Sequence, residues 1–369
     1  MSVYMLMNGD RPVLTFDFDD MYIHVENNIY LPYMLKDFIR DTSLSTRDDI
    51  KKSMRDISCV KDFLSGRVLS LSRENAKAIL NSSNLPQSLK TEERLKIVIA
   101  CRALNMEDNF WLKKEGEDIS YSEVDLRKHR LSEKSYDIAI LGHTITATAE
   151  ELIPDLTANG MFPKFWRRSG AFVELWKTDK AGGINSRSEV MASKYIREAG
   201  GCVVDYRLEN TKDYTFSVSK CMTDSSHSLI HAQDVIDWCI HTGQNFMEFI
   251  SNGFSEEFAN MCVADYVLAN TDRHSENWGF MVDNGNNSIS GFAPLYDLNQ
   301  SLIADEFGTD IDDLPYEPSE KNFAETVRKF AENSTIDFDR TNITGRCKSR
   351  WQNIQSIREQ SKISEDLER

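Results

Sequence analysis

The sequence predicts an α+β protein built from three consecutive parts, and three observations support this class. The stretch from about 44 to 135 has the character of helices. Residues 160–222 contain short apolar runs rich in aromatic and β-branched residues, which are typical of strands. From about 228 onward, helical patterns return and enclose a single hairpin. The expected order is therefore a helical N-terminal region, a mostly β layer and a mostly helical layer.

The first part is expected to open with β structure and to continue as helices. Alternating apolar residues in "VLTFDF" predict a strand, which follows a turn at "NGD" (8–10). Two of the helices are predicted at 72–80 and 91–104, and "NLPQ" at 84–87 separates them.

The second part is expected to be a β layer. The pattern changes near 136–150, where "YDIAIL" is an apolar run resembling a strand. One helix, at 187–199, interrupts the layer. Four further strands are predicted at 160–168, 171–178, 201–209 and 214–222.

The third part is expected to be mostly helical. Helices are predicted within 231–250 and 255–270, and a hairpin is predicted around Asn284-Gly285. Residues 305–320 hold seven acidic residues and no Lys or Arg, which predicts a solvated loop or linker. The tail, 319–369, is polar and helical in pattern.

The composition excludes some classes of protein and favours others. The formal net charge of -16 argues against bulk binding to nucleic acid or to an anionic membrane, since both require a positive field. The seven cysteines include no C-x-x-C pair, which favours reduced thiols in the cytoplasm. The first residues do not resemble a signal peptide, and no apolar stretch is long enough for a membrane span.

A cluster of polar residues follows the predicted helix at 255–270. Asp272 and Asn277 form D-x-x-x-x-N, the spacing with which protein kinases place a catalytic base and a Mg²⁺ ligand. The spacing occurs four times in the chain, but only this pair lies between a helix and a hairpin whose second strand leads to another aspartate, Asp297. Asp265 and Asn270 share the spacing, but we expect their side chains to diverge.

Ordinary structural interpretations of this cluster stay open. Asp272 could be a simple turn aspartate, as is common at helix ends. His274, in the same loop, fits an orienting hydrogen-bond partner better than a base or a ligand.

Lys177 lies near the end of an apolar strand, where an ammonium group is costly unless it meets an anion. ATP phosphates would serve, with Glu189 of the next helix holding the ammonium in place. Glu189 is expected to face the protein body, yet Ser186 and Glu189 also form a capping box. Lys177 could also direct its ammonium to solvent along the strand end.

Two loops of the β layer are candidate nucleotide contacts. Gly160 and Lys164 stand in a turn before a strand, where glycine lets backbone amides approach phosphate and lysine adds charge. A plain hairpin turn is the alternative. Cys221 and Met222 join the β and helical layers, and their backbone could hold adenine, although a simple linker explains them equally well.

Four motifs together resemble the HipA family of bacterial serine/threonine kinases, which share a kinase-like fold with the phosphatidylinositol 3/4-kinase group. They are "NTDRHSEN" (270–277), "APLYDL" (293–298), "NGMFPK" (159–164) and "LWKTD…SRSE" (175–189). The resemblance implies a bilobal protein-kinase-like fold with an additional N-terminal helical region. The expected parts are an accessory region of unknown role, a small mostly β lobe and a large mostly helical lobe, at 1–135, 136–222 and 223–369.

By position in these motifs, the resemblance implies a role for each candidate residue. Asp272 would be the catalytic base with His274 beside it, and Asn277 and Asp297 would bind Mg²⁺. Lys177 would contact the ATP phosphates with Glu189 as its partner, and Gly160 and Lys164 would lie in a phosphate loop. Some members of the family autophosphorylate a serine just before that glycine, and here Thr157 stands in that neighbourhood.

The expected activity is ATP- and Mg²⁺-dependent transfer of the γ-phosphate to a serine or threonine of a protein. The resemblance also implies a toxin role and a small helix-turn-helix antitoxin partner, although residues 1–135 do not align with the family's usual N-terminal region. The alternatives are a kinase of a small molecule or lipid, a non-catalytic pseudokinase-type binding module and a metal-dependent phosphohydrolase.

Overall fold

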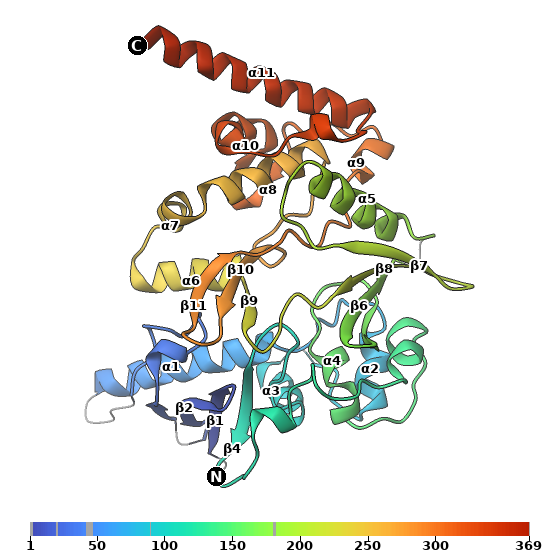
Figure 1. The fold of residues 1–369 in the computed structure, drawn as a ribbon. Coiled ribbons are helices and arrows are strands. Elements are labelled where there is room, and N and C mark those ends of the chain that lie inside the picture. Colours follow the sequence, from blue (N-terminus) through green and yellow to red (C-terminus); the bar gives the residue numbers. More distant parts are fainter. Residues whose placement is uncertain (1–2, 20, 42–46, 89, 180–181, 369) are drawn as a thin grey trace.

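In the computed structural model, the N-terminal region lies at one end of the molecule and the C-terminal helices lie at the other (Figure 1). The small β lobe and the hairpin of the helical lobe both adjoin the N-terminal region. The structure describes residues 3–19, 21–41, 47–88, 90–179 and 182–368, with side chains as far as residue 363. Within this part of the chain, no helix combines the length and the apolar content needed to cross a bilayer.

The N-terminal region combines an antiparallel sheet with helices. The strand order is β3-β2-β1-β4, from strands at Tyr22–Val25, Arg11–Asp17, Tyr4–Asn8 and Phe110–Lys114. The helices are α1 (Arg47–Gly66), α2 (Ala76–Ser82) and α3 (Thr91–Ala100). The predicted turn and strand near the start are confirmed, as is the break between α2 and α3. Strand β4 lies inside the stretch that was predicted to be helical, so that part of the prediction is wrong. The strand is stabilised by pairing with β1, about a hundred residues away in sequence, and a local pattern does not reveal such a partner.

The small lobe is a second antiparallel sheet of order β5-β6-β8-β7. Its strands occupy Lys164–Ser169, Phe172–Thr178, Thr215–Lys220 and Tyr206–Asn210, in agreement with the four predicted runs. Helix α5 (Ile184–Glu198) packs against β6, β7 and β8. The strand expected at "YDIAIL" is wrong, because Tyr136–Ile140 form a turn of π-helix whose apolar residues are buried. A short apolar run does not distinguish strand from helix.

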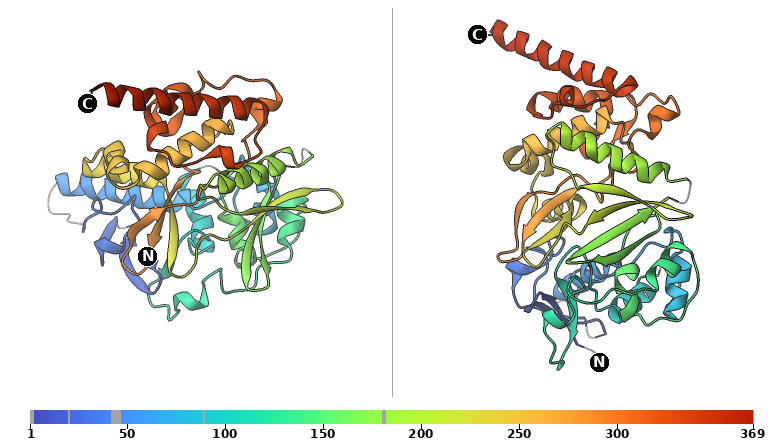
Figure 2. Two further views of the ribbon diagram at one scale, coloured as in Figure 1. Left: turned by 45° about the horizontal axis from the view of Figure 1, so that its top comes forward. Right: turned by 45° about the vertical axis from the view of Figure 1, so that its right-hand side comes forward.

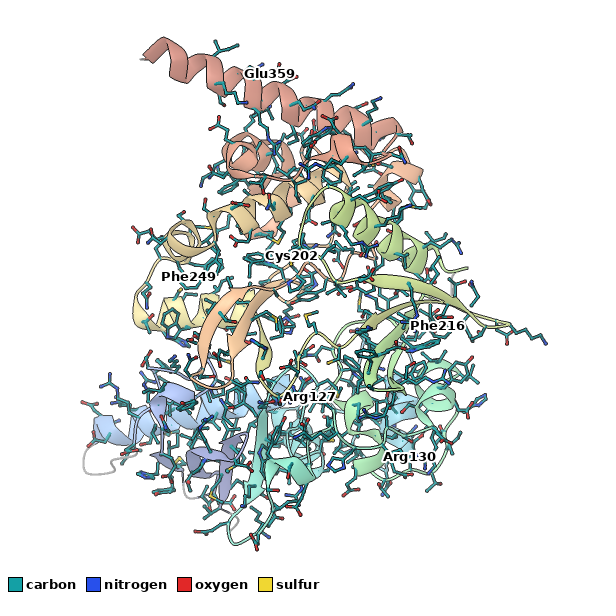
Figure 3. The ribbon with its side chains drawn as sticks, in the orientation of Figure 1. Arg127, Arg130, Cys202, Phe216, Phe249 and Glu359 are labelled. Atoms are coloured by element: carbon teal, nitrogen blue, oxygen red, sulfur yellow. The ribbon has the colours of Figure 1, made fainter. Side chains whose placement is uncertain are left out.

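The sheet of the small lobe lies between α5 and the N-terminal region (Figure 2). Phe216 and Val218 lie on one face of β8, and Ser217, between them, lies on the other. Phe216, labelled in Figure 3, belongs to the same hydrophobic core as Leu80 and Leu112 of the N-terminal region. One continuous core therefore joins the N-terminal region to the β lobe.

The helical lobe has its own core around α8 (Ser255–Val267). Helices α6, α7, α9, α10 and α11 occupy Ala232–Thr242, Phe246–Gly253, Ile303–Glu306, Phe323–Phe330 and Gly345–Glu368. The predicted hairpin is confirmed as β10 (Gly279–Asp283) and β11 (Ser288–Phe292). A third strand, β9 (His227–His231), pairs with β10 and was not predicted.

The acidic stretch 305–320 is only partly the solvated loop that the sequence predicted. Residues 306–310 are exposed, but Ile311 and Tyr316 are buried in the core of the helical lobe. The short strands β12 (Pro315–Tyr316) and β13 (Lys321–Asn322) pair with each other. The stretch therefore packs onto the helical lobe.

Candidate active site

The loop between α8 and β10 exposes Asp272 and holds Asn277 inside. The Asn277 amide nitrogen donates to the carbonyl oxygen of Asp272, and its amide oxygen accepts the backbone N–H of His274 at 3.0 Å. Asn277 is 2% exposed, whereas the side chain of Asp272 reaches solvent. Within the described residues, no hydrogen bond engages the Asp272 carboxylate. The five-residue spacing thus closes a loop and leaves one carboxylate free at its surface.

A second set of contacts fixes this loop from the protein interior. Arg273 is buried and pairs with Asp265 at 2.8 Å. It also donates to the carbonyl oxygens of Asn277 at 2.6 Å and Tyr296 at 2.8 Å. Burial would lower the pKa of Arg273, but the Asp265 carboxylate more than offsets this and raises it, so the guanidinium stays charged. Arg273 was not predicted from the sequence, although its place beside Asp272 was a usable signal.

The expectation that Asp265 and Asn270 diverge is wrong. The amide nitrogen of Asn270 donates to the Asp265 carboxylate at 2.9 Å. Ala269 has a φ of 51°, which turns the chain back so that Asn270 meets the helix it has just left. The same carboxylate accepts the Tyr316 hydroxyl at 2.8 Å. This second D-x-x-x-x-N pair is therefore a buried support for the exposed one.

Asp297, shortly after β11, meets the lysine of the small lobe. The Lys177 ammonium donates to Asp297 at 2.8 Å and to Glu189 at 2.7 Å. Glu189 is fully buried and also accepts the Ser217 hydroxyl at 2.5 Å. The predicted Lys177–Glu189 contact is confirmed, and Glu189 is not a helix cap, because α5 begins at Ile184.

The charges of this group depend on one another. Burial alone would lower the pKa of Lys177, but Asp297 and Glu189 more than offset it and raise the pKa. For Asp297, burial is outweighed by Lys177 and Lys164, which lower its pKa. Partial burial of the Asp272 carboxyl raises its pKa, His274 opposes this rise, and Asp297 adds to it. Lys177 and Asp297 therefore form one ion pair between the lobes, and Asp272 lies near enough for both charges to influence its pKa.

Gly160 and Lys164 form a tight turn at the edge of the site. Gly160 has a φ of 90°, which favours glycine, and a Cβ there would lie 2.6 Å from the Lys164 ammonium. That ammonium donates to the carbonyl of Asn159 at 2.5 Å. Burial and the nearby Lys177 lower the pKa of Lys164 to about 8. The turn therefore brings a second cation to the group.

A cavity of about 50 Å³ lies under this turn, lined by the turn, by β5 and β6, and by residues 105–107 of the N-terminal region. Thr157 also lines it. Thr157 is 2% exposed, and its hydroxyl donates to the Ile153 carbonyl at 2.8 Å. In this conformation the Thr157 hydroxyl does not reach solvent.

Cys221 and Met222 connect the two lobes, after β8 and before β9. The backbone N–H of Cys221 bonds to Val173 at 2.8 Å, which extends the sheet pairing. Within the described chain, the backbone N–H and carbonyl of Met222 make no hydrogen bond. The Met222 side chain packs against the cluster of Val204, Leu229, Ala293 and Tyr296. Met222 thus offers a free donor and acceptor beside apolar surface, which is what a flat heterocyclic ring requires.

His274 lies in the loop between α8 and β10 and accepts the backbone N–H of Glu276 at its Nδ1, 3.3 Å away. Its positive charge, when present, lowers the pKa of Asp272. These contacts fit a residue that orients the loop, and its chemical role stays a prediction.

A chain of polar contacts that was not predicted from the sequence links the N-terminal region to the helical lobe. The His231 ring contacts the Tyr296 hydroxyl at 2.8 Å and the Glu107 carboxylate at 3.3 Å. Burial would lower the pKa of His231, but Glu107 outweighs this and raises it to about 9. No sequence signal was available, because Glu107 lies more than a hundred residues from its partner.

The site has some of the features that Mg²⁺ requires. One oxygen of Asp297 accepts from Lys177 and Asn299, while its other oxygen has no hydrogen bond among the described residues. Asp297 has a φ of 54°, a conformation that is uncommon for residues other than glycine. Within the described chain, no three His, Cys, Asp or Glu side chains form a metal site by themselves. This is expected for Mg²⁺, which takes few protein carboxylates and completes its shell with water and phosphate.

Comparisons with known proteins identify the fold. Residues 217–339 match the family model of phosphatidylinositol 3- and 4-kinases. A solved structure of HipA in the Shewanella oneidensis MR-1 toxin–antitoxin complex with HipB and operator DNA has a TM-score of 0.54 and 13% identity, over 96% of this chain and 90% of that chain. The Helicobacter pylori proinflammatory kinase CtkA matches with a TM-score of 0.37 and 17% identity, over 53% of this chain and 90% of its own. No curated protein sequence matches significantly.

The chain therefore has a kinase-like α+β fold. More particularly, the fold is that of HipA over nearly the whole chain, and residues 217–339 form a phosphatidylinositol 3- and 4-kinase-like domain. The predicted fold class and the predicted resemblance are confirmed.

Proposed function

We propose that this protein is an ATP- and Mg²⁺-dependent kinase that transfers the γ-phosphate to a serine or threonine hydroxyl of a protein. The observation that carries this proposal is the meeting of Lys177 from the small lobe with Asp297 from the helical lobe, beside the free carboxylate of Asp272. Phosphoryl transfer depends mainly on positioning and charge neutralisation, which such a group provides.

Each residue has a role in the proposed reaction. The hydroxyl oxygen of the acceptor serine or threonine bonds to the γ-phosphorus, and Asp272 accepts the proton of this hydroxyl. ADP leaves with the electrons of the broken P–O bond. Lys177, held by Glu189, aligns the α- and β-phosphates of ATP. The turn that contains Gly160 and Lys164 covers these phosphates. Met222, next to Cys221, would accept and donate hydrogen bonds at the adenine edge.

Asp297 and Asn277 are the proposed Mg²⁺ ligands, and the metal would supply charge neutralisation on the phosphates. Asn277 can offer only the remaining lone pair of its amide oxygen, because the other accepts from His274. Asp297 is therefore the stronger candidate of the two.

The proposal is tested by incubating the chain with γ-labelled ATP, Mg²⁺ and a cell extract. The native chain should transfer label to protein, Asp272→Asn should not, and the exposed Asp310→Asn should behave as the native chain does. Intact mass after incubation with ATP would also detect self-labelling. Absence of transfer by the native chain would favour the non-catalytic binding module, and phosphate release from phosphoesters without Lys177 would favour the phosphohydrolase.

A kinase of a lipid or small molecule is the second candidate, because residues 217–339 match the phosphatidylinositol 3- and 4-kinase model. The net charge of -16 disfavours anionic lipid surfaces. Label in the organic or small-molecule fraction, instead of in protein, would support this candidate.

The partner is also part of the proposal. The HipA protein of similar fold was solved with HipB and operator DNA, so a small helix-turn-helix partner and a toxin role are proposed for this chain. A reading frame of that kind beside the gene, and its co-purification with the chain, would support the pairing. The cytoplasm is the proposed location.

A further inference from the structure

The segment 69–75 of the N-terminal region runs beside the turn that contains Gly160. The backbone N–H of Leu69 donates to the Leu156 carbonyl at 2.8 Å, and the N–H of Glu74 donates to the Met161 carbonyl at 3.0 Å. The two bonds fall on opposite sides of Gly160. The segment therefore contacts the chain on both sides of Gly160.

Arg73, in the middle of this segment, holds both ends of the turn. One terminal nitrogen of its guanidinium donates to the carbonyls of Asp155 at 2.7 Å and Ala158 at 3.2 Å. The other terminal nitrogen donates to the carbonyl of Lys164. Arg73 is 2% exposed, so these bonds lie away from solvent. The planar fork of arginine spans residues 159–163 in a way that a lysine ammonium does not reproduce.

The turn needs such support for a physical reason. A glycine gives the backbone wide conformational freedom, so a glycine-containing turn loses entropy when it closes over a ligand. Fixing the ends of the turn beforehand lowers this cost and improves affinity. The support comes from a part of the chain whose role the sequence did not indicate.

We propose that segment 69–75 holds the turn at residues 159–164 in a fixed conformation before ATP binds, and we call this segment the brace. Arg73 is its positioning residue. This inference rests on the proposed function, since the turn is taken to cover ATP phosphates. It assigns residues 69–75 of the N-terminal region a direct part in nucleotide binding.

The test compares Arg73→Lys and Arg73→Ala with the native full-length chain. Arg358→Lys is the matched control. Arg358 lies on α11, far from the turn, and it also donates to three backbone carbonyls, those of Ala331, Ser334 and Ile336. Two quantities are measured: the kinetic constants for ATP, and amide hydrogen exchange of the nucleotide-free protein.

In both Arg73 variants we expect KM for ATP to rise roughly tenfold, with kcat changed less than about threefold, because two or more charge-assisted hydrogen bonds are lost. The amides of Leu69 and Glu74 and of residues 157–164 should exchange faster, while the rest of the chain stays protected. Arg358→Lys should leave KM and this exchange unchanged.

Unchanged exchange at 69–75 and 157–164 in Arg73→Lys would overturn the brace. Faster exchange with unchanged KM would reduce Arg73 to a structural residue and would also overturn the proposal. If Arg73→Ala does not fold, Arg73→Lys decides. If the native chain binds no ATP, the proposed function fails, while the exchange experiment, which uses no nucleotide, still tests the brace separately.

Discussion

At the scale of single residues, the candidate site contains an exposed carboxylate and buried polar side chains that fix the loop carrying it. Asp272 carries an exposed carboxylate, whereas Asn277 and Arg273 use their polar atoms to fix its loop. The sequence predicted the exposed group because its spacing is a known pattern. It could not predict the Arg273–Asp265 pair, which forms only when the chain reverses at Ala269.

Replacing Asp272 by Asn should abolish phosphoryl transfer and leave nucleotide binding largely intact. The amide cannot accept the hydroxyl proton, yet it preserves the shape of a side chain that makes no hydrogen bond among the described residues. We expect a loss of at least about a hundredfold in kcat, the lower end for a general base. Turnover equal to that of the native chain would refute the assignment of the base.

Replacing Gly160 by Ala should weaken ATP binding. A Cβ at position 160 would lie 2.6 Å from the Lys164 ammonium, so the cation must move. Gly170→Ala is the matched control, because Gly170 also has a positive φ, of 60°, but has open space around it. Both variants should lose roughly 1–2 kcal/mol of unfolding free energy to backbone strain, but only Gly160→Ala should raise KM for ATP. Equal KM values in the two variants would contradict this role of the turn.

At the scale of elements, alternation and turn residues were sufficient to predict the strands of the small lobe and the hairpin β10–β11. Strands β4 and β9 were missed, because each pairs with a remote segment and is too short to be distinctive alone. The meeting of α5 with β6 was predicted through Lys177 and Glu189. That the hairpin returns Asp297 to the loop that precedes it stays a prediction, and the observed contact of Asp297 is with Lys177 of the small lobe.

Replacing Glu189 by Gln should destabilise α5 against the sheet. The change leaves the buried Lys177 ammonium with one carboxylate instead of two. Removing one partner of a buried ion pair typically costs several kcal/mol, and we expect about 3 kcal/mol here. Glu198→Gln, at the exposed end of the same helix, should change the unfolding free energy by less than about 0.5 kcal/mol. Similar losses in the two variants, measured by denaturant titration, would argue against the buried pair.

At the scale of the whole molecule, the N-terminal region and the β lobe share one hydrophobic core. The predicted boundary at residue 135 follows a change in sequence pattern, and a pattern carries no information about which surfaces pack together. A fragment of residues 136–369 should therefore expose Phe165, Phe216 and Val218 and fail to fold cooperatively. A sharp thermal transition of this fragment, close to that of the full chain, would contradict the shared core.

The contact between the N-terminal region and the helical lobe should depend on pH through His231. Its folded pKa, about 9, is above the ordinary value of 6.5, because of Glu107. Its stabilising contribution is therefore complete below pH 6.5 and is lost as the pH rises through 9. The melting temperature of the native chain should fall over this range relative to that of His231→Gln. Parallel curves for the two proteins would exclude this contribution.

The central claim is that residues from both lobes form one site for ATP with Mg²⁺, and calorimetric titration tests it most directly. ATP with Mg²⁺ should give saturable heat with the native chain, and far less with a chelator present or with Asp297→Ala. Equal binding with and without the metal, together with no effect of Asp297→Ala, would contradict this shared site. The absence of any heat with the native chain would contradict it as well.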